Sequence, residues 1–339
     1  MTASLPPVRT LADLHGRRVV VLGLARSGIA AARFLVDAGA EVTVYDRRAA
    51  AELTDAVAAL GDRRVRRLLG VDSAALAAAV AEADLLVTSP SVSPRFPTTD
   101  PWLRDLLADA ERRGLELLSE VELFLRLTRA RIAAVTGTKG KTTTATLLAA
   151  MLERGGVPSV LGGNIGTPLV ERADELDADT WAVLELSELQ LPTISRGAEV
   201  AVYTNVGADH IDRHGSVAAY RAVKARLAEL SAASGTLVLN ADDPGCRELA
   251  ARLPAAPHVA WYSTEADAAA TVRDGLLVLD GAPLMPVGEV RLPGRPMLHN
   301  VLAAALAAAR VGAPREAIAG AIRDFRGVAH RLETVGAWG

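Results

Sequence analysis

The chain has 339 residues, half of them apolar and 23% charged, so it is long enough for two or three domains. Its formal net charge of −3 argues against general electrostatic binding to nucleic acid or to an anionic membrane. The single cysteine, Cys246, excludes intrachain disulfides and a cysteine-built metal site. No export-type or membrane-spanning apolar run is present in the sequence, so we expect a cytoplasmic protein.

The first part of the chain predicts a parallel sheet. Strands are expected at residues 18–22, 41–45, 84–88 and 114–118. Between the first two strands lie a glycine turn and an alanine-rich helix at residues 29–38, which is the order of a right-handed βαβ unit. The pattern predicts an α/β fold whose N-terminal Rossmann-like domain covers residues 1–128.

A second α/β series is expected over residues 129–325. Its strands are predicted at residues 131–135, 181–186, 200–204 and 236–240, and helices at residues 217–230, 298–310 and 315–323, besides one directly after the first strand. This alternation indicates a mainly parallel sheet. Residues 326–339 end in what reads as a strand just beginning. We expect them to be a linker and the first strand of a third domain that is otherwise missing.

The segment TGTKGKTTT, residues 136–144, lies between a buried strand and a helix. Gly137 and Gly140 allow backbone N–H groups to converge on a phosphate, and the helix N-terminus adds partial positive charge. Lys141 can reach the outer phosphates, and the Thr142 hydroxyl can bind Mg²⁺. The strict Walker pattern has its first glycine two residues earlier, so this is a shortened variant. The segment predicts ATP binding.

A weaker glycine turn, GLARSG, occupies residues 23–28. It lacks the GxGxxG spacing because Ala25 replaces the middle glycine. Asp46 ends the next strand, where an acidic residue can bind a ribose hydroxyl. Arg47 and Arg48 beside it suit a nucleotide or another anion. On these residues alone, a plain turn and a ligand site are both open.

Polar side chains follow two strands of the second series. Glu185 stands at the end of one strand, where a carboxylate beside a phosphate loop can contact Mg²⁺. After the next strand come Asp209, His210, Asp212 and His214. A polar loop and a metal site are both open for these, and the position after Glu185 favours metal or phosphate chemistry. Lys224 follows on a predicted helix, where a surface lysine is the ordinary interpretation.

Together these segments resemble the Mur ligase family, the ATP-dependent amino-acid ligases of peptidoglycan synthesis. The shared motifs are GTKGKTT (137–143), GGNIG (162–166), ELSELQL (185–191), TNVGADHIDRHGS (204–216), AYRAVKARL (219–227), NADD (240–243), HNVLAA (299–304) and AHRLE (329–333). Several motifs in this order are more specific than any one alone. The resemblance implies that the second domain is the central P-loop ATPase-like domain of the family.

Within the family, GLARSG, YDRR (45–48) and TSPSVSP (88–94) resemble the branch that adds D-glutamate to UDP-N-acetylmuramoyl-L-alanine. The resemblance implies a cytoplasmic, monomeric, amide-forming ligase with no nucleic-acid or membrane partner. Its product would serve cell-wall biogenesis, and through it cell shape and division. The alternatives are a family member with another amino-acid or folate substrate, and a nucleotide- or UDP-sugar-binding protein without turnover.

The resemblance also assigns residues to each part of the site. Substrate-binding residues would be Ser27, Asp46, Arg48, Asn164 and Ser187. ATP would contact Gly137, Thr138, Lys139, Gly140, Lys141, Thr142, Thr143, Asn300 and Arg331. Two Mg²⁺ ions would be held by Thr142, Glu185, His210 and a carbamate on Lys224. The catalytic residues would be Lys141, His210 and Lys224.

Three departures from the family pattern bear on activity. Lys139 stands where asparagine is usual, and Met297 occupies a position often taken by asparagine, which weakens an adenine contact. The third domain, which in the family supplies the amino-acid site and a lid over ATP, is expected to be absent after Gly339. We therefore expect these 339 residues to fold but to ligate slowly or not at all.

Overall fold

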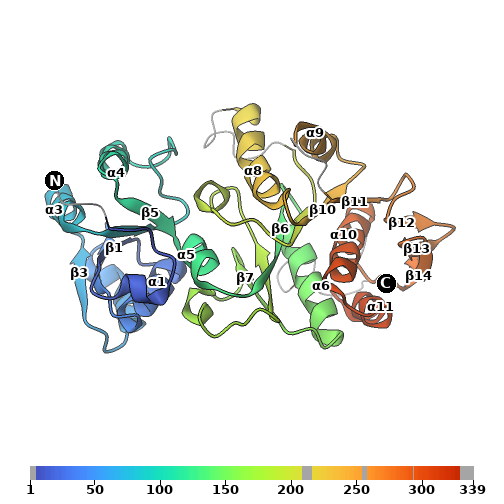
Figure 1. The fold of residues 1–339 in the computed structure, drawn as a ribbon, viewed down its shortest axis with the longest axis horizontal. Coiled ribbons are helices and arrows are strands. Elements are labelled where there is room, and N and C mark those ends of the chain that lie inside the picture. The colour runs from blue at the N-terminus through green and yellow to red at the C-terminus, as the bar shows by residue number, and fades with distance from the viewer. Residues whose placement is uncertain (1–4, 208–215, 254–257, 293, 329–339) are drawn as a thin grey trace, which may run out of the picture.

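The computed structural model describes residues 5–207, 216–253, 258–292 and 294–328. Over these ranges the chain forms two α/β units side by side, each on its own sheet (Figure 1). No helix in the described ranges combines the length and apolar character needed to cross a membrane. The strand expected near the C-terminus lies outside the described residues, and the predicted domain boundaries at 128 and 325 stay predictions.

The first unit is built on a fully parallel five-stranded sheet in the order β3-β2-β1-β4-β5. Its strands are β1 (Arg18–Leu22), β2 (Glu41–Asp46), β3 (Val65–Leu69), β4 (Leu85–Thr88) and β5 (Glu116–Ser119). Its helices are α1 (Arg26–Asp37), α2 (Thr54–Ala58), α3 (Ser73–Glu82), α4 (Pro101–Arg112) and α5 (Glu120–Leu127). The parallel-sheet prediction is confirmed. The sequence pattern does not predict the edge strand β3, because Arg66 and Arg67 interrupt its apolar run.

The second unit has a nine-stranded sheet in the order β14-β13-β12-β11-β10-β9-β6-β8-β7. Its strands are β6 (Arg131–Thr136), β7 (Ser159–Gly163), β8 (Trp181–Glu185), β9 (Val200–Tyr203), β10 (Thr236–Asn240), β11 (His258–Ser263), β12 (Ala270–Arg273), β13 (Leu276–Leu279) and β14 (Ala282–Pro286). Its helices are α6 (Lys141–Arg154), α8 (Val217–Ser231), α9 (Pro244–Arg252), α10 (Arg295–Val311) and α11 (Arg315–Asp324). Strand pairs from β7 to β12 are parallel, whereas β13 and β14 are antiparallel additions.

The central strand β6 is buried on both faces. Ile132 and Ala134 enter one hydrophobic core, and Ala133 and Val135 enter the other. Residues of α6, α10 and α11 pack in the second of these cores, and residues of α8 and α9 pack in the first (Figure 1). This double cover explains why β6 reads as a continuous apolar run. Because the loop follows the C-terminal end of β6, it lies at the carboxyl edge of the sheet, where ligands bind in open α/β folds.

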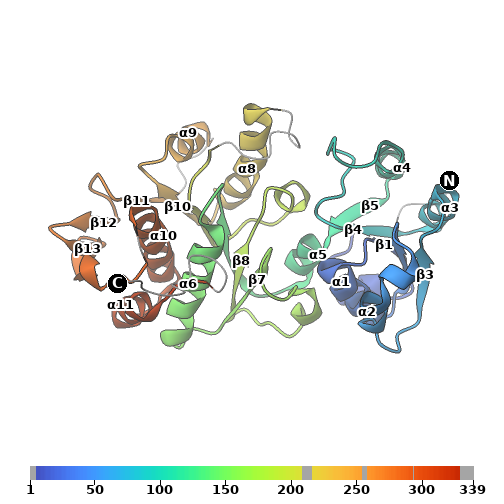
Figure 2. The ribbon, with the colours of Figure 1, turned by 180° about the vertical axis from the view of Figure 1, so that it is seen from behind.

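Helix α5 lies between the two sheets (Figures 1 and 2). One hydrophobic core joins Val21 of the first sheet, Phe124 of α5 and Leu184 of the second sheet. The first residue of α5, Glu120, is 3% exposed, and its Oε1 accepts a hydrogen bond of 3.1 Å from the Val170 N–H in the second unit. The two units are therefore packed through α5 and do not merely follow one another.

The buried Glu120 makes stability depend on pH. Burial raises the pKa of its carboxyl from 4.5 to about 7, and the Glu171 carboxylate nearby adds to the rise. The folded state binds this proton more tightly than the unfolded state, so the contribution is complete below about pH 4.5 and is lost as the pH rises towards 7. Glu120→Gln, which cannot ionise, is expected to raise the free energy of unfolding above pH 7 by up to about 3 kcal/mol.

Urea unfolding of the parent and of Glu120→Gln between about pH 5 and about pH 8 measures the difference in their free energies of unfolding. The gap between variant and parent should widen as the pH rises, because only the parent loses stability with the proton. Parallel stability curves across this range would contradict the assignment of the titration to Glu120.

Candidate active site

The loop after β6 is shaped by its two glycines. Gly137 has φ +147° and Gly140 has φ +85°, values that side chains of L-residues rarely adopt. A Cβ at Gly137 would clash with the Thr204 hydroxyl, and one at Gly140 would clash with the side-chain oxygen of Asn300. Asn300, in α10, therefore lies directly against the loop, and it is 4% exposed. Gly140 is followed at once by α6, whose N-terminal N–H groups suit an anion.

The side chain of Asn205 holds the backbone of this loop. Its Oδ1 accepts hydrogen bonds from the N–H groups of Thr138 (3.1 Å) and Lys139 (2.9 Å). Its Nδ2 donates to the Lys139 carbonyl at 3.0 Å, to which the Thr204 hydroxyl also donates at 2.6 Å. The side-chain amide thus accepts hydrogen bonds from the loop backbone and donates to it, as a neighbouring peptide group would. The sequence motif TNVGADH contains Asn205, but the residue pattern alone assigns it no role.

Replacing Asn205 by aspartate is therefore expected to weaken binding of an ATP analogue by about tenfold or more. The change removes one donor and sets a carboxylate against the Lys139 carbonyl and the phosphate-binding loop, a loss of roughly 1–3 kcal/mol. Isothermal titration with a non-hydrolysable ATP analogue measures it. Asn205→Ala, which adds no charge, should lose less affinity. Equal affinity in the parent and both variants would contradict the role given to this carboxamide.

Lys141 is the first residue of α6. Its Nζ donates to the carbonyls of Gly137 (3.0 Å) and Thr138 (3.2 Å), so the ammonium group lies over the loop. This geometry puts a positive charge beside the N–H groups of the helix N-terminus. The combination suits a polyphosphate.

Glu185 lies at the end of β8, paired in register with Val135 of β6. It is 2% exposed, and its two carboxylate oxygens have separate partners. The Thr142 hydroxyl donates to Oε2 at 2.7 Å, and the Asn164 Nδ2 donates to Oε1 at 2.9 Å. A hydroxyl and a carboxylate oxygen at this distance beside a phosphate loop are the hard ligands that Mg²⁺ prefers. The donor set therefore fits a magnesium ion.

Lys224, on α8, is fully buried. Its Nζ donates to the Thr136 hydroxyl at 3.1 Å and to the Gly137 carbonyl at 3.0 Å. Tyr220, one turn earlier, bonds the Thr138 hydroxyl at 3.1 Å through its own hydroxyl. The ordinary interpretation of Lys224 as a surface lysine is wrong, because α8 packs this side chain behind the loop.

The lysines of this chain are confined to the phosphate loop and its immediate surroundings. Lys139, Lys141 and Lys224 are the only three lysines in the sequence, in which arginine supplies every other strongly basic side chain. Two belong to the loop, and Lys224 bonds the loop backbone. A primary amine is chemically different from a guanidinium, since it can react as a nucleophile and concentrates its charge on one atom. All three lysines of the chain therefore lie in the phosphate loop or against it.

The first unit carries a second candidate site at the carboxyl edge of its sheet. A cavity of about 700 Å³ is lined by Gly23, Asp46, Arg48 and residues after β4. It lies at the ends of β1 and β4, where the strand order reverses and ligands bind in such folds. Asp46 and Arg48, whose role in substrate binding stays a prediction, both line this cavity.

Asp46 is held ionised in this cavity. Burial alone would favour the neutral acid, but hydrogen bonds from Arg48 and from the Leu24 N–H lower its pKa to about 2. Arg48 donates from Nε at 3.0 Å and from Nη2 at 2.8 Å, and the Leu24 N–H donates at 2.9 Å. The carboxylate is thereby fixed beside the first glycine turn.

Not all predicted substrate residues are brought to these two places. Ser27 lies in the first turn of α1 and is not among the residues that line the cavity. The N–H and hydroxyl of Ser187 both donate to the Gln190 side-chain oxygen at 3.0 Å. Asn164, by contrast, is bonded to Glu185, and its loop contacts the first unit, because Arg26 donates to the Gly166 carbonyl at 3.2 Å. His210 and Arg331 lie outside the described residues.

The fold and the loop define an α/β protein in which a Rossmann-like unit precedes a unit that carries a phosphate-loop motif. Residues 135–308 match the Mur ligase middle domain, and residues 17–105 match the Mur ligase MurD-like N-terminal domain. This chain belongs to the Mur ligase family, as the motif resemblance predicts.

Curated relatives extend this result. The chain is 41% identical over 326 residues to UDP-N-acetylmuramoylalanine–D-glutamate ligase of Solibacter usitatus, covering 95% of this chain and 69% of the relative. It is 38% identical over 336 residues to the enzyme of the same name from Acidobacterium capsulatum, with the same coverage. The chain thus spans about 69% of the length of these relatives.

Solved structures support the fold. A UDP-N-acetylmuramate:L-alanyl-gamma-D-glutamyl-meso-diaminopimelate ligase from Neisseria meningitides has a TM-score of 0.65 at 21% identity, over 92% of this chain and 99% of that chain. UDP-N-acetylmuramate-alanine ligase from Thermotoga maritima has a TM-score of 0.60 at 17% identity, over 94% of this chain and 70% of that chain. At these identities the likeness concerns the architecture alone.

Proposed function

We propose that this chain is an ATP-dependent, amide-forming ligase that joins D-glutamate to UDP-N-acetylmuramoyl-L-alanine in peptidoglycan precursor synthesis. The observation that carries the chemistry is the bond of Thr142 to Glu185 beside the phosphate loop, with Lys224 buried behind it. The shared name of the relatives supports D-glutamate as the amino acid. Cytoplasmic location, monomeric state and the absence of nucleic-acid or membrane partners stay predictions.

The two substrates would be held by different units. ATP would bind with its phosphates on the 137–143 loop, against the α6 N-terminus and Lys141, and with Asn300 beside the loop. The UDP group would occupy the first-unit cavity beside Asp46 and Arg48. The muramoyl-alanine end would then extend past the Arg26–Gly166 contact towards Asn164, which is bonded to Glu185.

Thr142 and Glu185 would hold one Mg²⁺, and His210 with a carbamate on Lys224 would hold a second. Addition of CO₂ to the Lys224 amine turns a cation into an anionic oxygen ligand, which explains a buried lysine beside a metal site. When bound, the ions neutralise phosphate charge. Ser27 and Ser187 remain proposed substrate contacts.

The reaction activates a carboxylate that does not otherwise react with an amine. The γ-phosphoryl group of ATP passes to the alanyl carboxylate, which gives an acyl phosphate and ADP. The amine of D-glutamate attacks the acyl carbon, and phosphate leaves from the tetrahedral intermediate. Lys141 and the α6 N-terminus stabilise charge on the phosphoryl oxygens, and the protein otherwise positions the reactants. No side chain is required as a covalent nucleophile.

A phosphate-release assay tests this function. The chain is incubated with ATP, UDP-N-acetylmuramoyl-L-alanine and each member of a panel of amino acids, with the Solibacter usitatus relative as positive control. We expect release that is slower than that of the relative, as the sequence predicts, and that depends on D-glutamate and not on its L-enantiomer. Release that depends on another amino acid would replace D-glutamate in the proposal, and release without the UDP substrate would reject it.

A further inference from the structure

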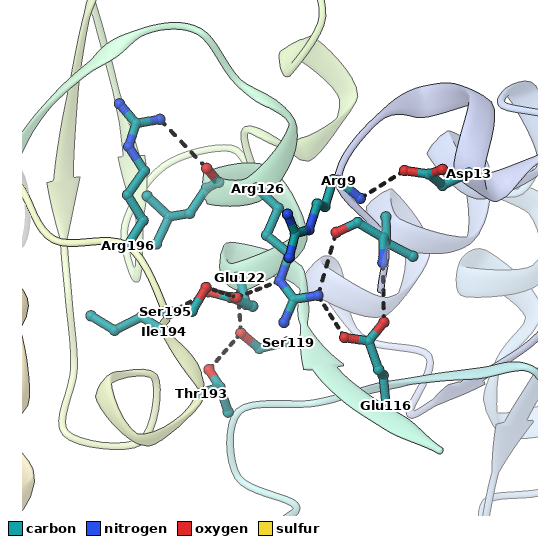
Figure 3. A network of polar contacts seen from close by, with 12 residues as sticks. Arg9, Asp13, Glu116, Ser119, Glu122, Arg126, Thr193, Ile194, Ser195 and Arg196 are labelled. Carbon is teal, nitrogen blue, oxygen red and sulfur yellow. Dashed lines mark hydrogen bonds and ion pairs between the residues drawn. The ribbon is translucent and has the colours of Figure 1, made fainter. Parts of the chain in front are cut away.

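A polar network lies where α5 meets residues 193–196 of the second unit (Figure 3). Both α5 and residues 193–196 are close in sequence to the proposed ATP site. The C-terminal end of α5 is followed within four residues by β6 and its loop, and residues 193–196 come eight residues after Glu185. The network therefore joins the first unit to the two strands that carry the loop and Glu185.

The N-terminal end of α5 is held by the hydroxyl groups of Ser119, Thr193 and Ser195. Ser119 caps the helix by accepting a hydrogen bond from the Glu122 N–H at 3.1 Å, and its hydroxyl shares a bond of 2.8 Å with Thr193. The Glu122 carboxylate accepts from the Ser195 N–H at 2.8 Å and from the Ser195 hydroxyl at 2.5 Å. The Glu122 side chain is fully buried, so these bonds are shielded from water.

The C-terminal end of the helix is held by the next residue of the same segment. Arg196 donates to the carbonyls of Thr128 (3.1 Å) and Ala130 (2.8 Å), and more weakly to that of Leu125. A cation at the end of a helix also interacts favourably with its dipole. One four-residue segment of the second unit thus holds α5 at both ends.

Glu122 also connects to the first unit. Arg126 donates to Glu122 through Nε at 2.6 Å and to Glu116 of β5 through Nη1 at 2.8 Å. Glu116 in turn accepts from the Val8 N–H at 3.1 Å. The Glu122 carboxylate therefore accepts hydrogen bonds from Arg126 of its own helix and from Ser195 of the second unit (Figure 3). A buried carboxylate with every bond made is costly to disturb.

This arrangement has a consequence for a substrate that spans both units. The apolar core around α5 holds the units together, but hydrophobic contact is non-directional and does not by itself fix an angle. Hydrogen bonds to a buried carboxylate are directional. A reacting carboxylate misplaced by about 1 Å can lose roughly a hundredfold in rate. The angle between the two sheets therefore bears directly on transfer from ATP.

We propose that Glu122 is a positioning residue for the ligase reaction, which fixes through α5 the orientation of the first-unit cavity relative to the phosphate loop. This inference rests on the proposed function only for its effect on turnover. The effect on orientation follows from the described contacts and can be measured without substrate.

The orientation test uses Glu122→Gln, which keeps the shape of the side chain but presents an NH₂ group to one of its donors. The matched control is Asp84→Asn, because Asp84 accepts from the Arg18 N–H and guanidinium entirely within the first unit. Spin labels are placed at the exposed residues Ala51 and Ala251, after replacement of the buried Cys246 by alanine. Pulsed electron spin resonance should give a narrow distance distribution for the parent and the control, and a broadened or displaced one for Glu122→Gln. An unchanged distribution would overturn the proposal.

The functional test separates binding from turnover. Titration with UDP and with an ATP analogue should give affinities within about twofold of the parent for Glu122→Gln, whereas kcat should fall by about tenfold or more. Loss of both affinities in step with kcat would mean general destabilisation and would overturn the positioning role. If Glu122→Gln does not fold, the ligand affinities and kcat are measured instead for Ser195→Ala, which removes only the hydroxyl bond to Glu122. The same outcomes then support or overturn the positioning role. If the parent shows no ligase activity, the distance measurement still decides, so failure of this inference is distinct from failure of the proposed function.

Discussion

Replacing Glu185 by glutamine is expected to lower kcat for ATP-dependent phosphate release by about two to three orders of magnitude. The buried carboxylate accepts from Thr142 and Asn164 and is the proposed anionic ligand of the first Mg²⁺. Glutamine keeps the size of the side chain and removes the charge. The lost charge stabilisation of a metal-assisted phosphoryl transfer amounts to several kcal/mol, which corresponds to this rate loss. Steady-state phosphate release over a range of Mg²⁺ concentrations measures the effect.

A matched control is available at the other end of the same sheet. Glu199→Gln makes the same charge change at a carboxylate that accepts from the Ile132 N–H at 2.6 Å, near the start of β6 and far along the strand from the loop. We expect its kcat to stay within about threefold of the parent. A Glu185→Gln enzyme with parental kcat and parental Mg²⁺ dependence would reject Glu185 as the metal ligand.

The second large effect is expected at Lys224. Lys224→Met fills a similar buried volume with an apolar chain, which the interior tolerates. It removes the bonds to Thr136 and Gly137 and the amine that the proposed carbamate requires. We expect kcat to fall by about a hundredfold or more, because an anionic ligand of the second Mg²⁺ is lost. Thermal unfolding of the variant checks that the fold is retained.

The small number of lysines makes the carbamate directly observable. With ¹³C-bicarbonate, the parent should show a carbamate carbon resonance, and Lys224→Met, which retains Lys139 and Lys141, should not. Lys139→Met is the control and should keep the signal. A resonance that survives in Lys224→Met, or one absent from the parent at saturating bicarbonate, would contradict carbamylation of Lys224.

The local sequence pattern predicts most of the fold. Buried parallel strands such as β1, β6 and β8 are short apolar runs, and the sequence pattern predicts the ends of each within one residue. The strands that the pattern did not predict include the sheet edges β3, β7 and β14. An edge strand is covered on fewer sides, so arginines in β3 and glycines in β7 are tolerated there. Their strand form comes from pairing with a neighbour rather than from their own sequence.

The candidate site also has a part that the sequence predicts and a part that depends on contacts between distant residues. The loop with Lys141 and Thr142 is contiguous in sequence, so its chemistry could be inferred directly from residue order. The bond of Thr142 to Glu185 crosses 43 residues and that of Lys224 to Thr136 crosses 88. The role of Asn205 depends on β9 lying next to β6, a pairing that no local pattern predicts.

The sequence by itself determined the class of this protein: two α/β units, a phosphate loop, and a set of motifs whose order identifies the Mur ligase family. Local backbone preference and short motifs carry that information, because glycines, strand periodicity and neighbouring side chains act within a few residues. Only the tertiary structure decided that Lys224 is buried behind the loop, that Asn205 holds the loop backbone, and that Glu122 joins the two units through α5. These are contacts between residues far apart in the chain, and burial and hydrogen-bond geometry exist only once the strands and helices have packed.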